Sequence, residues 1–254
     1  MTIQGSGGIC LQGGGEFGPR CRAMDLQVLR RAGPGPVVVT ALAGSPGRDY
    51  ATATSRGARW YRSLGAAAVV EAPDGREEED AAYQLCRTAG LLVLPGGSPR
   101  RLLSALTATK IGTAIREVLA GGGAVSGASA GAMVLCGWTY LPETGTVEAG
   151  LGLVPDALVV PHFTGDLRWL ARAAPPEGTR IFGLPEQSGV WIGAGAVTGL
   201  GADAVTVLDG GRQQLLAAGQ TAGPRPVKPA APRPVKPAAS RPVKPAAPKS
   251  VNPP

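Results

Sequence analysis

The feature that most constrains the fold is a repeated alternation between short apolar runs and longer segments with helical periodicity. The apolar runs predict strands at residues 8–12, 36–42, 67–71, 91–94, 124–126, 157–160, 179–183, 189–192 and 205–208. Helices are predicted at 20–31, 50–64, 77–87 and, as two helices, 99–119. Such alternation favours βαβ crossovers, so we expect an α/β fold with a doubly wound, mostly parallel sheet and helices on both faces.

A Gly-x-Ser-x-Gly pentapeptide occupies residues 127–131, between a predicted strand and a small apolar segment that can begin a helix. This context is the one a nucleophile elbow requires, where a serine sits on a sharp turn from strand to helix. We therefore take Ser129 as the candidate nucleophile. The alternative is an ordinary glycine-rich turn with no chemical role.

A serine hydroxyl needs a base, and His162 is the only histidine in the chain. It follows an apolar run, which places it at the carboxyl end of a predicted strand. A third group must orient the imidazole. Glu186 is the first choice and Glu143 the second, whereas Asp166 is expected to cap a helix.

Loops at the carboxyl ends of the predicted strands are rich in glycine, and active sites collect at that edge of a parallel sheet. The backbone amides of Gly97 and Ala130 suit an oxyanion hole. Gly96 and Ser98 flank Gly97 and are predicted to contact substrate. The glycines at 13–15 match neither G-x-G-x-x-G nor a P-loop, so a phosphate site is not expected.

The net charge of +7 belongs to the end of the chain. Residues 222–254 carry seven basic residues, no acidic residue and a repeated Arg-Pro-Val-Lys-Pro-Ala-Ala unit. This composition predicts an extended tail after a folded domain at 1–221. The tail is either dispensable or a weak contact for an acidic or proline-recognising partner. Since the domain itself is formally neutral, nucleic-acid binding by it has no support.

The remaining composition predicts a cytoplasmic protein without a metal site or cofactor. The four cysteines are scattered without metal-ligand spacing, which indicates buried, reduced thiols. No apolar run is long enough to cross a bilayer, and the first residues contain no secretion signal.

Four motifs in order make the chain resemble the S51 serine peptidases, which include dipeptidase E and cyanophycinase. They are Gly-Gly-Gly-Glu-Phe at 13–17 with Cys-Arg-x-Met-Asp at 21–25, Leu-Pro-Gly-Gly at 94–97, Gly-Ala-Ser-Ala-Gly-Ala at 127–132 and Pro-His-Phe at 161–163. The resemblance extends from about residue 8 to 208. It implies a flavodoxin-like, class I glutamine-amidotransferase-like fold in which serine replaces the usual cysteine.

The resemblance also implies roles for particular residues. Cyanophycinases place the acid after the histidine, at Glu186, whereas dipeptidase E places it between serine and histidine, near Glu143. A family preference for aspartyl substrates implies an arginine in the pocket, with Arg168, Arg100 and Arg20 as candidates. Cyanophycin itself is a doubtful substrate, because the residues around His162 depart from that subfamily's pattern.

We therefore expect a serine-type peptidase or amidase that hydrolyses a small peptide, with an aspartyl dipeptide as one candidate. The alternatives are an acyl-transfer enzyme that uses the same serine, a glutamine amidotransferase and a catalytically silent binding protein. The amidotransferase is less favoured because that chemistry uses a cysteine at the elbow. The sequence leaves open whether two copies form a homodimer.

Overall fold

A computed structural model describes residues 7–168 and 173–223. The predicted tail at 222–254 therefore lies outside the described residues from 224 onward. Ala222, the first residue of that predicted tail, still belongs to a strand.

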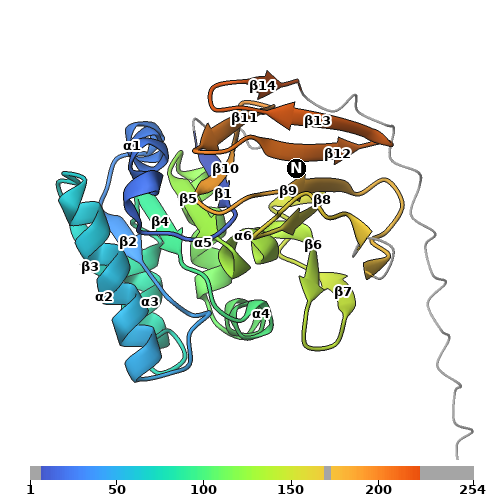
Figure 1. Ribbon diagram of the computed structural model, residues 1–254. Coiled ribbons are helices and arrows are strands. Elements are labelled where there is room, and N and C mark those ends of the chain that lie inside the picture. Colours follow the sequence, from blue (N-terminus) through green and yellow to red (C-terminus); the bar gives the residue numbers. More distant parts are fainter. Residues whose placement is uncertain (1–6, 169–172, 224–254) are drawn as a thin grey trace, which may run out of the picture. The chain divides into compact units, whose positions relative to one another are not determined.

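The first sheet has eight strands in the order β14-β11-β10-β1-β5-β4-β2-β3 (Figure 1). Five neighbours, from β1 to β3 in that order, run parallel, and β10, β11 and β14 extend the sheet in antiparallel fashion. Its strands are β1 (Gly8–Gln12), β2 (Val37–Val39), β3 (Val69–Glu71), β4 (Leu91–Leu94), β5 (Ala124–Ala128), β10 (Ser188–Gly193), β11 (Ala196–Gly201) and β14 (Thr221–Ala222).

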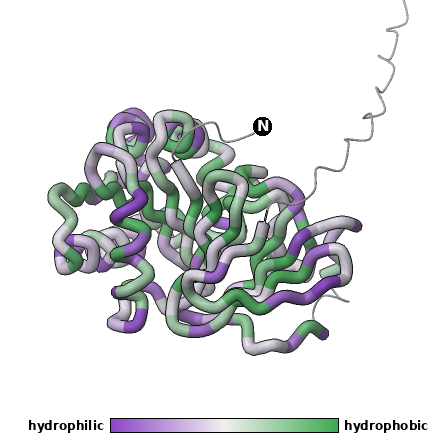
Figure 2. Tube along the Cα trace, turned by 90° about the horizontal axis from the view of Figure 1, so that it is seen from above, coloured by the Kyte–Doolittle hydropathy of each residue, from purple (hydrophilic) through white to green (hydrophobic). Residues whose placement is uncertain are grey.

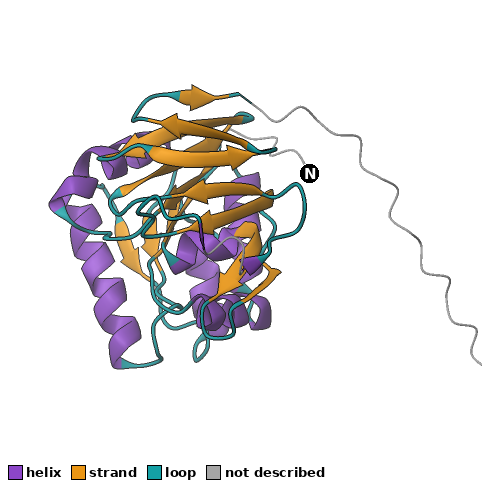
Figure 3. Cartoon of the chain, turned by 45° about the vertical axis from the view of Figure 1, so that its right-hand side comes forward, coloured by secondary structure: helices purple, strands orange, loops and turns teal. Residues whose placement is uncertain are grey.

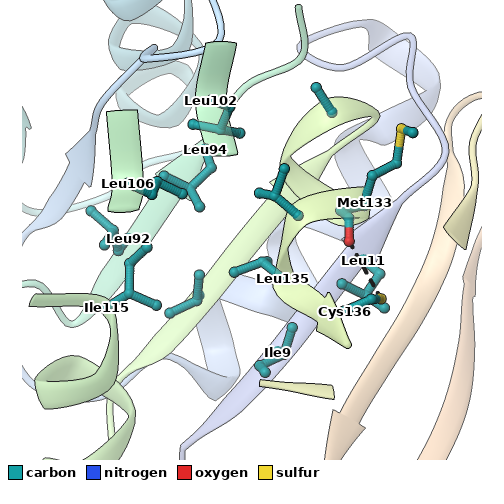
Figure 4. Packing of buried hydrophobic residues seen from close by; sticks show 14 of the residues in the cluster. Ile9, Leu11, Leu92, Leu94, Leu102, Leu106, Ile115, Met133, Leu135 and Cys136 are labelled. Carbon is teal, nitrogen blue, oxygen red and sulfur yellow. Dashed lines mark hydrogen bonds between the residues drawn. The ribbon is translucent and has the colours of Figure 1, made fainter. Parts of the chain in front are cut away.

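Helices cover both faces of the parallel part, as the alternation predicted. The helices are η1 (Pro19–Cys21), α1 (Arg22–Arg31), α2 (Arg48–Ser63), α3 (Glu79–Cys86), α4 (Pro99–Ala108), α5 (Ile111–Ala120) and α6 (Ala130–Leu135). Successive strand residues point to opposite faces. Accordingly Ile9 and Leu11 pack in the cluster that contains residues of α3 to α6, while Cys10 packs in the cluster with residues of α1 and α2. Figure 4 shows the first cluster, in which Leu94 lies beside Leu102.

A second sheet of six strands was not predicted as a separate layer. Its order is β13-β12-β9-β8-β6-β7, and Figure 3 shows both sheets in orange. The strands are β6 (Cys136–Leu141), β7 (Thr146–Ala149), β8 (Val154–Val160), β9 (Arg180–Gly183), β12 (Val205–Asp209) and β13 (Arg212–Leu216). The runs predicted at 157–160, 179–183 and 205–208 form β8, β9 and β12 of this sheet.

Five strands were not predicted from the sequence, namely β6, β7, β11, β13 and β14. The first four residues of β13 are exposed, and β7 is exposed or partly exposed along its length, so neither presents an apolar run. Figure 2 shows that hydrophobic segments, in green, follow the interior strands while hydrophilic ones, in purple, lie mainly toward the outside. Within 7–168 and 173–223, no helix is long and apolar enough to cross a membrane.

Candidate active site

Ser129 lies on the sharp turn between β5 and α6. Its backbone adopts φ 48° and ψ −110°, a strained conformation for a residue with a side chain. A Cβ on Gly127 would stand 2.5 Å from the Gly131 carbonyl carbon, and a Cβ on Gly131 would stand 2.2 Å from the Leu94 oxygen. Both glycines of the pentapeptide are therefore required for the chain to turn this tightly.

The imidazole of His162 connects Ser129 with Glu186. Its Nε2 lies 3.1 Å from the Ser129 hydroxyl, and its Nδ1 lies 3.1 Å from a carboxylate oxygen of Glu186. A proton on Nδ1 satisfies both contacts, because Nδ1–H then donates to Glu186 and Nε2 accepts from the serine. His162 and Glu186 follow β8 and β9, two parallel neighbours in which Val160 pairs with Gly183. Their side chains are about half exposed, so the site is open to solvent.

The loop that follows β1 holds all three of these segments through backbone carbonyls. Ser129 N–H donates to the Gln12 oxygen at 2.9 Å, His162 N–H to the Gly13 oxygen at 2.9 Å, and Gln187 N–H to the Gly14 oxygen at 2.7 Å. Gly14 has φ 124°, and a Cβ on it would stand 2.3 Å from His162 Cε1. The glycine run at 13–15 thus lets the backbone approach the imidazole.

The loop between β4 and α4 brings Gly97 to the same edge as Ser129. Gly97 has φ 145°, and a Cβ there would stand 2.6 Å from the Ala43 oxygen. Its N–H donates to no group in the described part of the chain. Ala130 is the first residue of α6, so its N–H has no partner within the helix. Both amides are therefore available as hydrogen-bond donors, and their role as an oxyanion hole stays a prediction.

Gly96 lies against the serine, since a Cβ on it would stand 3.3 Å from Ser129 Cβ. Its N–H is already engaged, because it donates to the Glu16 carboxylate at 2.8 Å. Glu16 and Gly96 line a cavity of about 460 Å³, whose walls also include Arg48 and Arg56. No role was predicted from the sequence for Glu16, Arg48 or Arg56. The signal for Glu16 was its place in the Gly-Gly-Gly-Glu-Phe motif.

Glu143, the second candidate for the acid, contacts a different predicted residue. Ser98 caps α4, where its hydroxyl accepts from Arg101 N–H and donates to Glu143 Oε1 at 3.2 Å. Among the contacts of residues 7–168 and 173–223, none joins Glu143 to His162. The structure therefore brings Glu186, and not Glu143, to the imidazole.

Each of the three arginines predicted for substrate recognition forms an ion pair with its own acidic residue. The pairs are Arg168 with Asp166 at 2.7 Å, Arg100 with Glu148 at 3.8 Å and Arg20 with Asp203 at 3.1 Å. The Arg168 side chain is 92% exposed. Its part in substrate binding stays a prediction.

A buried carboxyl group, Asp25, lies beneath the site without taking part in it. It accepts from Gln12 Nε2 at 2.7 Å and from Trp60 Nε1 at 2.8 Å. Burial raises the pKa of Asp25 to about 6, although the two hydrogen bonds lower it, and the charge of Glu16 raises it further. Gln12 also carries the backbone oxygen that binds Ser129, so Asp25 braces the strand end that supports the nucleophile.

The described residues were searched for metal-ligand clusters, and the environment of each cysteine is defined. Over the ranges 7–168 and 173–223, no group of three or more His, Cys, Asp or Glu side chains could hold a metal ion. All four cysteines are free and buried. Burial raises the pKa of the Cys10 and Cys86 thiols to about 12 and that of Cys21 to about 11, so these thiols stay protonated near neutrality.

Comparisons with known proteins find one matching family profile and solved structures of similar fold. The profile of peptidase family S51 matches residues 43–198, a range that contains Ser129, His162 and Glu186. No curated protein matches the sequence. Among solved structures, a peptidase from an acI-B1 Actinobacterium superposes with a TM-score of 0.74 at 23% identity and covers 85% of this chain and 96% of its own. A protein from Listeria monocytogenes EGD-e, provisionally named peptidase E, superposes with a TM-score of 0.59 at 17% identity, covering 77% of this chain and 98% of its own. At these identities the two structures show a shared fold.

Proposed function

The chain belongs to peptidase family S51, a family of serine-type peptidases, and we propose that it hydrolyses a small peptide or amide with Ser129, His162 and Glu186. The observation that carries the proposal is the continuous contact from the Ser129 hydroxyl through both imidazole nitrogens to the Glu186 carboxylate. This is the arrangement that activates a serine for acyl transfer to water.

In the proposed reaction, His162 Nε2 takes the hydroxyl proton as Ser129 Oγ attacks the scissile carbonyl carbon. The carbonyl oxygen gains negative charge, and the amides of Gly97 and Ala130 donate to it; one such donor contributes about 10²- to 10³-fold in rate. The imidazolium, held by Glu186, then protonates the leaving nitrogen as the carbon–nitrogen bond breaks. Water, deprotonated by the same imidazole, releases the acyl group and restores the serine.

The choice of Glu186 as the acid rests on contact geometry. Its carboxylate accepts from the imidazole, whereas the Glu143 carboxylate accepts from Ser98. A Ser-His-Glu triad is therefore favoured over one that contains Glu143.

We propose that the substrate carries an acidic residue on its acyl side. Arg48 and Arg56 support this, because both line the cavity beside Gly96 and neither forms an ion pair within the described residues. Arg56 donates only to the Glu16 backbone oxygen, at 3.3 Å. Two unpaired guanidinium groups favour a carboxylate-bearing ligand. The sequence-predicted arginines, in contrast, are paired with other groups.

The wider setting of the enzyme also remains a proposal. Free, buried cysteines fit a reducing compartment, so we propose a cytoplasmic location. We retain the division into a folded domain at 1–221 and a basic tail at 222–254 that contacts an acidic or proline-recognising partner. Whether two copies of the protein form a homodimer stays an open question.

The test is intact-mass spectrometry after treatment with a fluorophosphonate, applied to the wild type and to Ser129→Ala and His162→Ala. One adduct that maps to Ser129 and is lost in both variants is expected, because the reagent needs an activated serine. Hydrolysis of acidic dipeptides, followed with and without competing amines, then separates hydrolysis from acyl transfer. A folded wild-type protein that forms no adduct would contradict the proposal.

A further inference from the structure

The loop between β2 and α2 supports the loop that carries Gly97 through the carbonyl group of Ala43. This oxygen accepts from Ser98 N–H at 3.1 Å and from Arg101 Nη1 at 2.9 Å. A Cβ built on Gly97 would stand 2.6 Å from the same oxygen and 2.9 Å from Ala43 Cβ. Gly97 therefore lies directly against the Ala43 peptide group, and the position of that group determines where the Gly97 backbone can lie.

Arg76, which follows β3, holds the carbonyl groups on either side of Ala43. Its Nη1 donates to the Gly44 oxygen at 2.9 Å and to the Leu42 oxygen at 3.4 Å. Asp74 fixes this guanidinium group, because its Oδ1 accepts from Arg76 Nε at 2.8 Å and its Oδ2 accepts from Nη2 at 2.7 Å. Burial alone would raise the pKa of the Asp74 carboxyl, but the hydrogen bonds and charge of Arg76 outweigh burial and lower that pKa, so the pair is ionised at neutral pH.

The guanidinium group of Arg101 is committed to Ala43. Within residues 7–168 and 173–223 it forms no ion pair, and its one hydrogen bond is the charge-assisted contact with the Ala43 oxygen. Arg101 lies in the first turn of α4, where the helix dipole disfavours a positive charge and no acidic residue offsets it. The contact with Ala43 gives a physical reason for a cation at this unfavourable position.

Hydrogen bonds must hold this part of the loop because open space adjoins it. Arg76, Ser98 and Arg101 all line a cavity of about 750 Å³. The wall of this cavity along α4 continues with three small residues, Ser104, Ala105 and Ala108. Short side chains of this kind leave the space open, so the position of the loop depends on the arginine contacts.

We infer that Arg101 is a positioning residue for the oxyanion donor Gly97 and acts through the Ala43 carbonyl. The Asp74–Arg76 pair holds the neighbouring carbonyl groups. The inference rests on the proposed function, in which Gly97 N–H donates to the oxyanion. Such a donor must come within about 3 Å of the oxyanion, which forms only as the bound substrate reacts. Loss of the Arg101 contact should therefore slow the reaction of bound substrate without weakening its binding.

The experiment replaces Arg101 with methionine, which keeps a long side chain and a similar helix propensity but removes every donor. Saturation kinetics of fluorophosphonate labelling give the maximum rate at which the bound reagent reacts and, separately, the reagent concentration at half saturation. Arg101→Met should lower the maximum rate by about 10- to 100-fold, which is part of the effect of losing one oxyanion donor, and leave the half-saturating concentration unchanged. Arg101→Lys should recover part of the rate, because an ammonium group can still donate to a carbonyl oxygen.

The matched control is Arg116→Met. Arg116 is an exposed arginine of α5 that also donates to a backbone carbonyl, that of Leu151, at 2.7 Å. Neither residue belongs to the candidate active site, so this variant should label at the wild-type rate.

Hydrogen exchange tests the same contact without any reaction. The prolines at 95 and 99 have no N–H, so a peptide covering residues 95–99 reports only the three amides between them, which include Ser98 N–H. Arg101→Met should speed exchange in this peptide by about 10-fold or more, the range for loss of a hydrogen bond to a charged group, whereas Arg116→Met should not.

Three results would overturn the inference. They are an unchanged maximum labelling rate in Arg101→Met, a higher half-saturating concentration as its only effect, and unchanged exchange at residues 95–99. An Arg101→Met protein that does not fold, or an Arg101→Lys protein that labels no faster than Arg101→Met, would contradict it as well, because the inference assigns Arg101 to the loop through a hydrogen bond. Faster exchange at residues 95–99 in Arg101→Met, combined with a wild type that forms no adduct, would contradict the proposed function and leave the link between Arg101 and this loop standing.

Discussion

Replacing Gly14 with alanine should separate positioning of the imidazole from stability of the fold. The new Cβ would stand 2.3 Å from His162 Cε1 and 2.8 Å from Nδ1. Non-bonded carbon atoms rest about 3.5–4.0 Å apart, so the ring must move by roughly 1 Å or more. The contacts of His162 with Ser129 and Glu186 are both 3.1 Å long, near the limit for a hydrogen bond, and neither survives such a shift.

We expect Gly14→Ala to lower kcat/KM, and the rate of fluorophosphonate labelling, by about 100-fold or more, the effect of misplacing a reacting group by about 1 Å. The alanine also adopts φ 124°, which should cost about 1–3 kcal/mol of the free energy of unfolding. Activity and urea denaturation measured on the same preparations give both quantities.

The matched control is Gly152→Ala. Gly152 has φ 69°, but nothing lies within 4 Å of its built Cβ, so this variant adds backbone strain without a clash. It should lose about 1 kcal/mol of stability and keep its activity. A Gly14→Ala protein that labels at the wild-type rate would refute the argument that the glycine run exists to admit the imidazole.

Four further outcomes follow from the structure. Glu186→Gln should lower kcat by about 10²- to 10⁴-fold in steady-state kinetics, while Glu143→Gln changes it little. The reverse pattern would identify Glu143 as the acid of the triad. Burial raises the pKa of Asp25 to about 6, so the folded protein retains a proton that the unfolded chain releases, and the free energy of unfolding falls as pH rises from about 4 to 6. Between pH 4 and 6 the free energy of unfolding of Asp25→Asn, relative to that of the wild type, should therefore rise by about 3 kcal/mol. Urea denaturation at several pH values measures this, and a difference between the two proteins that does not change with pH would contradict it. Arg48→Gln should lower kcat/KM for Asp-Ala more than for Ala-Ala. Equal losses for the two dipeptides would show that Arg48 does not recognise the acidic side chain. Truncation after Gly223 should leave kcat/KM of the domain unchanged and lower its pI, as measured by activity assay and isoelectric focusing.

The sequence predicted that Ser129 and His162 lie at one edge of the fold, because each follows a strand with a clear apolar pattern. Ser129 follows β5 and His162 comes soon after β8, and both runs were recognised from hydrophobicity alone. The carboxyl ends of parallel strands share one edge of a sheet, so their neighbourhood follows from the pattern. The candidate donors Gly97 and Ala130 were predicted by the same reasoning.

The sequence alone did not show which acidic residue contacts His162. β6 and β9 both flank β8 in parallel, so residues beyond either strand come near His162. β6 instead turns into a hairpin with β7 and carries Glu143 toward Ser98. Hydrophobic patterns place strands but do not say which neighbour's loop folds back over the imidazole. The exposed strands β7 and β13, which complete that sheet, had no such pattern either.

The end of β1 and the loop after it hold the backbones of the candidate catalytic residues. The carbonyl oxygens of three successive residues, Gln12 to Gly14, accept hydrogen bonds from the N–H groups of Ser129, His162 and Gln187. The end of one strand therefore positions the backbone of all three segments of the candidate triad. Glu16 continues the same segment and lies outside residues 43–198, the range that the family profile matches. A substitution at residue 14 should therefore alter whether a bound peptide reacts, because that residue lies against the imidazole.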